Sequence, residues 1–223
     1  MRIIERGGST SPPLRQRRWD WTGTIPAPHV RDQGPFQACV SCALANMIEA
    51  RHWIRRNTHI TVVAGYVHKC LFGIGDFERS LDPGAALPGV KRDGIAVGPD
   101  AGFPVGPSVC TARDLFRIDD CGWLIGQNVI LNHLVENGPL IATMRVEDQS
   151  FRALGSGIYQ MPPEGAGRRY LHAVLLLGYD LDSGCISFLN SFGPSWGVGG
   201  VGKVRFGSGG LFITSSGAEA LIA

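Results

Sequence analysis

A chain of 223 residues, 44% of them apolar, is long enough to build one large core or two small ones. Its 21 lysines and arginines are nearly balanced by 19 aspartates and glutamates, which excludes the strong field that draws many proteins to nucleic acid or to an anionic membrane. The uncharged, largely apolar run of residues 121–135 contains several polar side chains and is too short to span a bilayer. We therefore expect a globular protein whose partners include neither nucleic acid nor a membrane.

The first eighteen residues form a basic segment with five arginines and one glutamate. No apolar run follows them that would form the core of a signal peptide. We expect a disordered tail over residues 1–18 and a cytoplasmic, reducing location, in which most of the six cysteines stay free and buried. The sequence leaves open whether Cys70, Cys110 or Cys121 forms a disulfide.

Residues 38–56 contain neither proline nor glycine, which favours a long helix. The small or apolar side chains that recur there at helical spacing are Cys39, Cys42, Ala43, Met47, Ala50 and Ile54. Weaker patterns predict helices over about residues 60–72, 84–92 and 127–137, the last of which should end at Gly138-Pro139.

The C-terminal part changes to short β-rich segments bounded by Gly, Pro, Asp or Ser. The predicted strands are residues 140–146, 157–161, 172–180, 185–192 and 201–207. A helical first half followed by an antiparallel second half predicts an α+β protein with two lobes and a cleft between them.

Cys39 and Cys42 form a CxxC pair at the start of the long helix. A redox pair of this kind usually follows a strand, whereas a Pro/Gly loop precedes Cys39. A zinc site would need a second close pair of ligands, which the sequence does not supply. A thiol in the first turn of a helix is activated by the helix N-terminus. We therefore favour Cys39 as a nucleophile and Cys42 as its buried neighbour, with the redox and zinc interpretations as weaker alternatives.

A nucleophilic cysteine needs a base, and the chain has six histidines. His172 stands out because it begins an apolar strand that would anchor it in a core while the ring faces a cleft. Taken alone, His172 fits a structural role equally well. Asn190 ends a second apolar strand, where its amide could orient the ring of a histidine on a neighbouring strand.

Three blocks of the chain resemble, in the same order, the signature segments of papain-like cysteine peptidases. These blocks are Gln33-Gly34 with Ala38-Cys39, then His172-Ala173-Val174, then Asn190-Ser191-Phe192-Gly193 with Ser195-Trp196-Gly197. In such enzymes the histidine and asparagine follow the cysteine by about 130–150 residues, and His172 and Asn190 follow Cys39 at that distance. Weaker similarity extends from about residue 19 to residue 206.

The resemblance implies a papain-like, two-lobed α+β fold that forms a single catalytic domain over residues 19–223. Its N-terminal lobe, about residues 30–125, would be mainly helical and contain the central nucleophile helix. Its C-terminal lobe, about residues 126–223, would be an antiparallel, β-barrel-like structure.

The resemblance also assigns roles. Cys39 would be the nucleophile and His172 its acid/base partner, the two forming a thiolate–imidazolium pair. Asn190 would hold the imidazole ring, and the Gln33 side chain would stabilise the oxyanion together with the Cys39 backbone N–H. The mechanism implies no metal and no cofactor.

The chain departs from the family pattern near the nucleophile. Phe36, Gln37 and Val40 stand where relatives usually have Cys, Gly and Trp, so a lobe disulfide is lost and a larger side chain borders the cleft. A substrate-binding glycine pair is not recognisable within residues 76–84, and we expect no pro-region. The side chains expected to contact substrate are Gln37, Thr143, Tyr170, Leu171, Phe192 and Trp196.

Three functions fit these residues. The first is a cysteine peptidase or amidase that acts on a peptide or amide through an acyl-thioester on Cys39. The second is an acyltransferase or amide ligase that passes the acyl group of a natural-product or carrier-bound thioester to an amine. The third, a catalytically silent binding module, is disfavoured because Cys39, His172, Asn190 and Gln33 are all present. The oligomeric state is left open.

Overall fold

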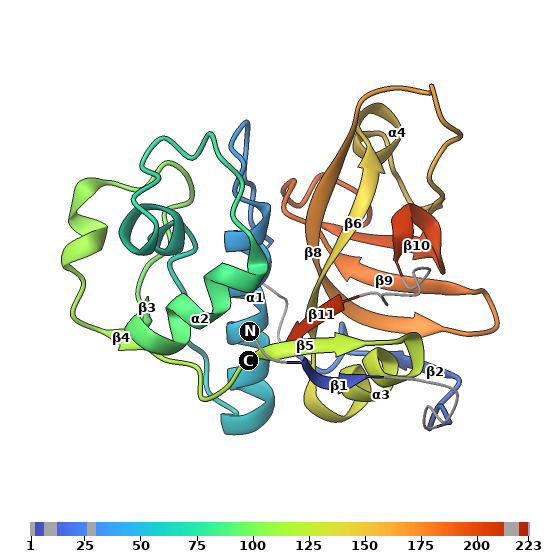
Figure 1. Ribbon diagram of the computed structural model, residues 1–223, viewed down its shortest axis with the longest axis horizontal. Coiled ribbons are helices and arrows are strands. Elements are labelled where there is room, and N and C mark those ends of the chain that lie inside the picture. The colour runs from blue at the N-terminus through green and yellow to red at the C-terminus, as the bar shows by residue number, and fades with distance from the viewer. Residues whose placement is uncertain (1–2, 7–12, 26–29, 212–218, 223) are drawn as a thin grey trace.

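The 18-residue helix α1 (Cys39–Arg56) stands between a mainly helical half and a large β-sheet in the computed structural model (Figure 1). The structure describes residues 3–6, 13–25, 30–211 and 219–222. Helix α1 ends where Asn57 takes a left-handed conformation, with φ 51°, and donates its backbone N–H to the carbonyl of Trp53. The helix predicted for residues 38–56 is confirmed.

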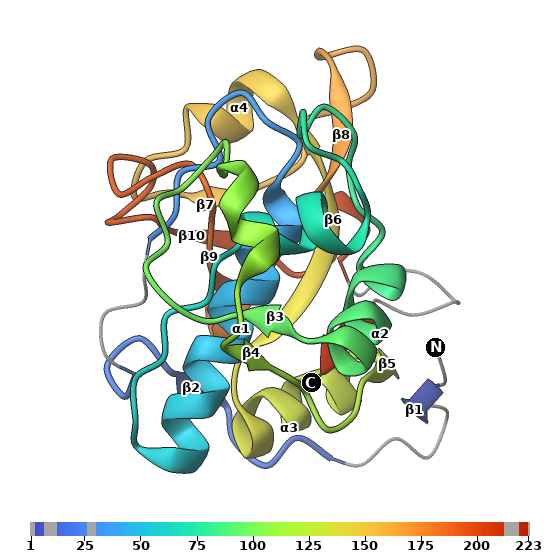
Figure 2. The same ribbon diagram turned by 90° about the vertical axis from the view of Figure 1, so that its left-hand side faces the viewer.

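The helical half covers the side of α1 that faces away from the sheet (Figure 2). It contains the π-helical turn η1 (Val67–Leu71), α2 (Pro83–Asp93), the short 3-10 helix η2 (Pro107–Thr111), and a two-stranded sheet of β3 (Ile95–Ala96) and β4 (Leu115–Phe116). Helix α2 starts at Pro83 after the side chain of Asp82 caps the N–H of Gly84 at 2.9 Å. The predicted helix over residues 84–92 is confirmed, whereas of residues 60–72 mainly the second half is helical.

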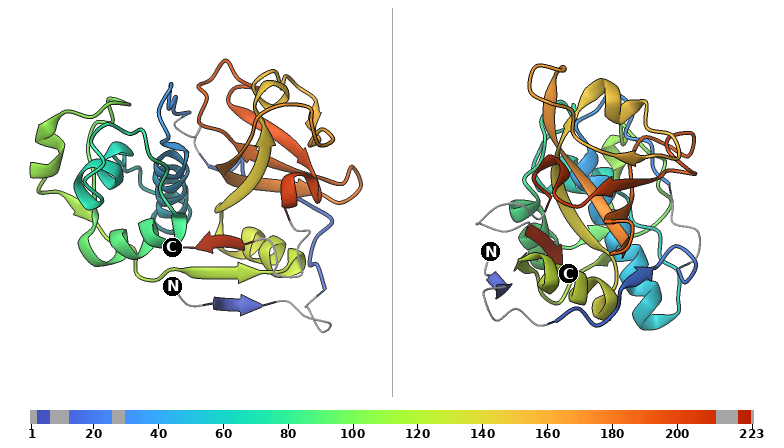
Figure 3. Two further views of the ribbon diagram at one scale, coloured as in Figure 1. Left: turned by 45° about the horizontal axis from the view of Figure 1, so that its top comes forward. Right: turned by 90° about the vertical axis from the view of Figure 1, so that its right-hand side faces the viewer.

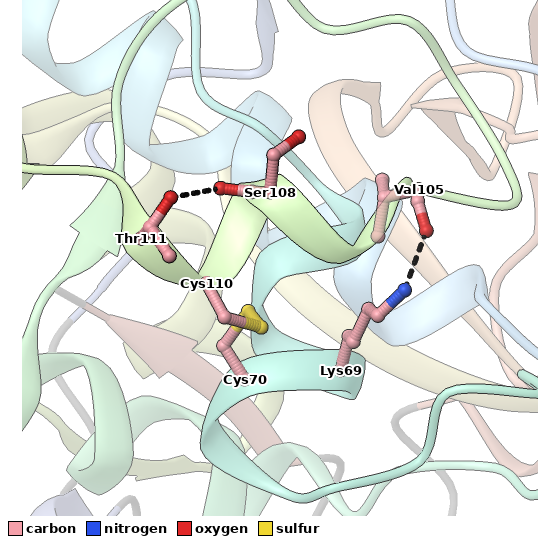
Figure 4. The surroundings of a disulfide bond; sticks show 6 residues. All are labelled: Lys69, Cys70, Val105, Ser108, Cys110 and Thr111. Carbon is pink, nitrogen blue, oxygen red and sulfur yellow. Dashed lines mark hydrogen bonds between the residues drawn. A yellow bond between two sulfur atoms is a disulfide. The ribbon is translucent and has the colours of Figure 1, made fainter.

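A disulfide between Cys70 and Cys110 joins η1 to η2 (Figure 4). Next to it, Lys69 Nζ donates a 2.8 Å hydrogen bond to the carbonyl of Val105. The other four cysteines are buried thiols that form no disulfide, as predicted for most of the six. Disulfides are typical of oxidising compartments, so this bond does not support the expected cytoplasmic location, which stays a prediction.

The second half of the molecule is a nine-stranded sheet in the order β1-β5-β11-β6-β8-β9-β10-β7, with β2 paired to β8. The strands are β1 (Ile3–Arg6), β2 (Arg18–Asp20), β5 (Gly122–Ile125), β6 (Leu140–Glu147), β7 (Ile158–Tyr159), β8 (Arg169–Asp180), β9 (Cys185–Leu189), β10 (Val201–Arg205) and β11 (Glu219–Ile222). The accompanying helices are α3 (Gln127–Asn137), α4 (Asp148–Arg152) and the short 3-10 helix η3 (Ser208–Gly210). The pairs are antiparallel except β1–β5 and β7–β10. The predicted α+β class is confirmed.

The 12-residue strand β8 is the centre of this sheet and runs alongside α1 (Figure 3). It pairs with β6 on one side and with β9 on the other, and residues 172–179 are all buried. At Gly178 the backbone of β2 comes so close that a Cβ would lie 2.3 Å from the carbonyl oxygen of Trp19. A glycine is therefore required where β2 joins the sheet.

The prediction of a disordered tail over residues 1–18 is wrong for the residues that the structure describes. Ile3–Arg6 pair in parallel with β5 as strand β1. Further along, Asn132 Nδ2 donates to the carbonyl of Pro13 at 3.2 Å, and the Tyr179 hydroxyl donates to the carbonyl of Gln16 at 2.9 Å. Side chains of α3 and β8 thus hold the backbone of this segment. Residues 1–2 and 7–12 lie outside the described part.

Within the described residues, no helix combines the length and the apolar character needed to cross a membrane.

A buried arginine ties the two segments that flank the nucleophile helix to the helix itself. The side chain of Arg31 is 3% exposed and lies 2.6 Å from a Glu49 carboxylate oxygen and 2.7 Å from one of Asp100. It also donates to Asn46 and, at 2.7 Å, to the carbonyl of Val62. Burial alone would lower the pKa of Arg31, but the hydrogen bonds and charges of the two carboxylates raise it. We call Arg31, Asn46, Glu49 and Asp100 the Arg31 cluster.

Replacing Arg31 should leave two carboxylates without their counter-charge in the core. We expect Arg31→Met to lower the free energy of unfolding by about 3–5 kcal/mol, measured by urea denaturation. Lys91→Met is the control, because Lys91 pairs with Asp120 at 2.9 Å while both side chains are 45% exposed, and such a surface pair contributes at most about 1 kcal/mol. Equal stabilities of the two variants would contradict the role of the Arg31 cluster.

Candidate active site

Cys39 is the first residue of α1 and is 7% exposed. Burial raises the pKa of its thiol, while hydrogen bonds from the backbone of Ala173, Val40 and Cys39 itself lower it. The helix start therefore acts in the direction predicted from the sequence, but burial outweighs it. Cys42 is fully buried one turn further along, and burial raises the pKa of its thiol as well. The predicted burial of Cys42 is confirmed, and Cys39 is the more exposed of the two.

His172 lies on β8, and strand pairing places Asn190 beside it. Strand β9 pairs with β8 and ends at Leu189, so the next residue, Asn190, reaches the imidazole with a 2.7 Å contact between its Oδ1 and His172 Nε2. The same Oδ1 accepts the backbone N–H of Ser191 at 2.8 Å, which identifies it as the amide oxygen. Nε2 is therefore the donor, and Nδ1 of the neutral ring is left to accept a proton.

Three aromatic rings surround the imidazole. The ring centroids of Phe192, Phe151 and Tyr170 lie 5.1, 5.4 and 6.0 Å from that of His172. The histidine is 2% exposed. Burial lowers the pKa of His172 to about 4, a hydrogen bond with Asn190 opposes this, and the charge of Arg152 adds to it.

Burial therefore disfavours the thiolate–imidazolium pair that was expected from the sequence. A lone thiolate on Cys39 and a lone imidazolium on His172 are each destabilised by loss of solvent. Proton transfer from the thiol to the imidazole creates both charges together, so that each compensates the other. The two groups can ionise as a pair more readily than either can alone.

Gln33 connects the loop before α1 to the end of β9. Its Oε1 accepts the Ser191 hydroxyl at 2.6 Å, and its backbone N–H donates to the Ser191 carbonyl at 2.9 Å. Its Nε2 uses one hydrogen for the carbonyl of Phe36 at 2.6 Å, which leaves the second hydrogen for another acceptor. Gln33, Ser191, Asn190 and His172 thus form one hydrogen-bonded chain. The sequence did not single out Ser191, although it follows Asn190 directly.

One pocket of about 100 Å³ brings most of the predicted residues together. Its lining contains Gln33, Gln37, Cys39, Tyr170, Leu171, His172 and Phe192 from that set, and it also contains Gly34, Pro35, Phe36, Asp148, Arg152 and Arg168. Asn190 is buried behind His172 and acts through it.

Thr143 and Trp196 were expected to contact substrate but do not line this pocket. Thr143 is exposed on β6, opposite Ala173. Trp196 is 6% exposed, and its indole N–H donates to the carbonyl of Phe151 at 2.9 Å. Its observed contacts are those of a core residue that supports the aromatic rings around His172.

Gln37 is fixed to the segment in which a glycine pair was sought. Its backbone N–H donates to the carbonyl of Phe77 at 2.8 Å, and its Oε1 accepts the Ser80 hydroxyl at 3.2 Å. The narrowing of the cleft by Gln37 stays a prediction, and these bonds hold the side chain beside the pocket.

Asp148 and Arg152 in the pocket were missed because helix α4 was not predicted. The carboxylate of Glu147 caps α4 by accepting the backbone N–H groups of Gln149 at 3.1 Å and Ser150 at 2.8 Å. Glutamate is not among the residues usually preferred at this position, so the five-residue helix gave no clear signal.

Comparisons with known proteins agree with this geometry. A sequence model described as "Papain family cysteine protease" matches residues 15–212. Macrodontain-1 from Ananas macrodontes is 22% identical in an alignment of 193 residues that covers 83% of this chain and 87% of that protein. Digestive cysteine proteinase 2 from Homarus americanus is 25% identical in an alignment of 215 residues that covers 87% of this chain and 62% of that protein.

Solved structures confirm the expected two-lobed fold. The structure of proCathepsin B S9 from Trypanosoma congolense matches with a TM-score of 0.80 and 18% identity, and the match covers 100% of this chain and 82% of that one. The Carica candamarcensis cysteine protease CMS1MS2, solved in complex with E-64, matches with a TM-score of 0.71 and 21% identity, and covers 93% and 97% of the two chains.

The burial of His172 can be tested once its charged partner is removed. In Cys39→Ala no thiolate can stabilise an imidazolium, so we expect His172 to stay neutral at pH 6 and to titrate with a pKa of about 4, followed by NMR of the imidazole. Adding Arg152→Gln should raise that pKa, because the Arg152 charge lowers it. A midpoint near the ordinary value of about 6.5 in Cys39→Ala would contradict burial as the dominant cause.

Proposed function

Since this chain belongs to the papain family of cysteine proteases, we propose that it is a peptidase or amidase that cleaves an amide bond through an acyl-thioester on Cys39. The observation that carries the proposal is the 2.7 Å hydrogen bond between His172 and Asn190, which leaves Nδ1 of His172 as the acceptor in the pocket that Cys39 also lines. A nucleophile, an oriented base and an oxyanion donor are thus available in one place.

The residues support an ordinary acyl-transfer sequence. His172 Nδ1 takes the thiol proton as Cys39 Sγ attacks the carbonyl carbon, and the C–N bond breaks as His172 returns the proton to the leaving amine. The developing oxyanion would accept the second Nε2 hydrogen of Gln33 and the Cys39 N–H, which as a first-turn helical N–H has no partner within the helix. Water, activated by His172, then releases the acid.

The shape of the pocket supports restricted specificity. It measures about 100 Å³, well below the 300–1,000 Å³ that is typical of ligand sites. The fixed side chain of Gln37 borders it on one wall. We infer that few residues on the acyl side of the substrate are accommodated.

Transfer of the acyl group to an amine is the second candidate. Cys39 and His172 are 7% and 2% exposed, and a thioester formed at so enclosed a position meets little water. An amine bound in the pocket would then compete well with hydrolysis.

Labelling and turnover separate these possibilities. We expect iodoacetamide to alkylate Cys39 and to leave Cys42 unmodified, as read by mass spectrometry, and we expect Cys39→Ala to lose peptide hydrolysis. Cys42→Ala is the matched control and should keep its activity if it folds. Labelling of Cys42 in preference to Cys39, or activity that survives Cys39→Ala, would rule out the mechanism. Near-stoichiometric transfer to an added amine would identify a ligase.

The oxyanion role of Gln33 predicts a loss confined to the chemical step. We expect Gln33→Ala to lower kcat by roughly 10²–10³-fold, the usual effect of removing one oxyanion donor. Gln37→Ala, on the same loop, should change KM more than kcat. A higher KM with an unchanged kcat in Gln33→Ala would show that Gln33 binds substrate without stabilising the transition state.

A further inference from the structure

Two arginines lie on the His172 wall of the pocket, beyond the residues that the mechanism uses. Arg152 is the last residue of α4, and Arg168 directly precedes β8. Both line the pocket together with Cys39 and His172, and Asp148 is the only acidic side chain among the described residues of that lining. The two arginines and Asp148 together therefore give this wall a net positive charge.

Arg152 is held in a defined position. Its Nε lies 2.7 Å from Asp148 Oδ1, and its guanidinium carbon lies 4.8 Å from the centre of the Phe192 ring. Phe192 in turn packs against His172, with ring centroids 5.1 Å apart. A cation stacked on an aromatic face keeps the edge of its guanidinium available for further hydrogen bonds. The positive charge of Arg152 also lowers the pKa of His172.

Arg168 and Tyr170 supply further donors. Arg168 is exposed, and no ion pair involves its side chain among the described residues. The Tyr170 hydroxyl is shielded from solvent and lies near the Asp148 carboxylate, although the two make no hydrogen bond of good geometry. Burial raises the pKa of Tyr170 to about 12, so the hydroxyl keeps its proton at neutral pH. Two guanidinium groups therefore border a small pocket whose described lining contains one carboxylate.

The reaction defines which part of a substrate meets this wall. His172 gives its proton to the leaving amine, so that nitrogen and the residue attached to it must lie against His172 during bond cleavage. The side chain or terminal carboxyl group of this leaving residue is the part of the substrate that Arg152 and Arg168 can reach.

We propose that Arg152 and Arg168 bind a carboxylate on the residue that follows the scissile bond, so that the enzyme selects substrates with an acidic leaving part. The inference rests on the proposed cleavage function and adds its specificity. A guanidinium matches a carboxylate with two parallel hydrogen bonds, which gives both affinity and orientation. The carboxylate is either the side chain of Asp or Glu or the free terminus of the peptide.

A matched peptide series tests the selection. A randomised peptide library, read by mass spectrometry, first defines the cleaved sequence. Peptides that differ only in the residue after the cut, with Asp, Asn or Lys there and an amidated terminus, then give kcat/KM ratios. A further peptide with Asn at that position and a free carboxyl terminus close behind it measures the other carboxylate source. We expect either carboxylate to be favoured over its neutral counterpart roughly tenfold or more.

Variants assign the preference to the two arginines. The ratio of Asp to Asn, or of free to amidated terminus, should fall in Arg152→Gln and in Arg168→Gln and approach one in the double variant. Arg152→Lys should keep part of the preference for a carboxylate. Asp148→Asn should increase this preference, because a carboxylate that competes for the arginines is removed. Arg205→Gln, on β10 outside the pocket lining, should leave it unchanged.

A substrate whose leaving group is an uncharged coumarin amine separates a test of the carboxylate specificity from a test of the cleavage function. It carries no residue after the scissile bond, so its cleavage rate in wild type and in each arginine variant measures the catalytic step apart from any contact with a carboxylate, and the peptide ratios are compared with that rate. Cleavage of this substrate without any preference for a carboxylate in the peptides would overturn the specificity and leave the function standing. Failure to cleave it or any peptide would overturn the proposed function itself.

Discussion

The site depends on the charge of Arg31 being compensated inside the core. A guanidinium removed from water must find carboxylates and carbonyl oxygens, and Arg31 finds them in Glu49 on α1, in Asp100 and at Val62. This requirement brings three segments that are far apart in the chain to one point. Gln33, two residues after Arg31, is held by the same anchor, and it passes the constraint on to Ser191 beside the histidine.

The sequence was informative where a residue type and a position within an element carried the signal together. Cys39 opens a helix without Gly or Pro, His172 lies near the start of a buried strand, and Asn190 follows another. These positions fix each side chain relative to its own backbone, and the pairing of β8 with β9 does the rest. The fold class and the grouping of the four catalytic candidates were therefore predictable from local pattern and resemblance.

The features that the sequence did not reveal depend on contacts between distant segments. Residues 13–16 were predicted to belong to a disordered basic tail, yet the side chains of Asn132 and Tyr179 donate hydrogen bonds to their backbone. Arg31 and Ser191 are polar residues in loops, and nothing local shows that they will be buried. The pKa of His172 follows the same rule, because its shift comes from the rings that the tertiary fold packs around it.

The shared oxygen of Asn190 affects how His172 gains and loses its proton during the reaction. Oδ1 accepts the N–H of Ser191 and the Nε2–H of His172, and the latter bond is the same whether the ring is neutral or charged. Protonation and deprotonation then occur at Nδ1 alone, with no exchange of partners behind the ring. The dipoles that meet each new charge are already in place, so the reorganisation energy of each proton transfer is kept small.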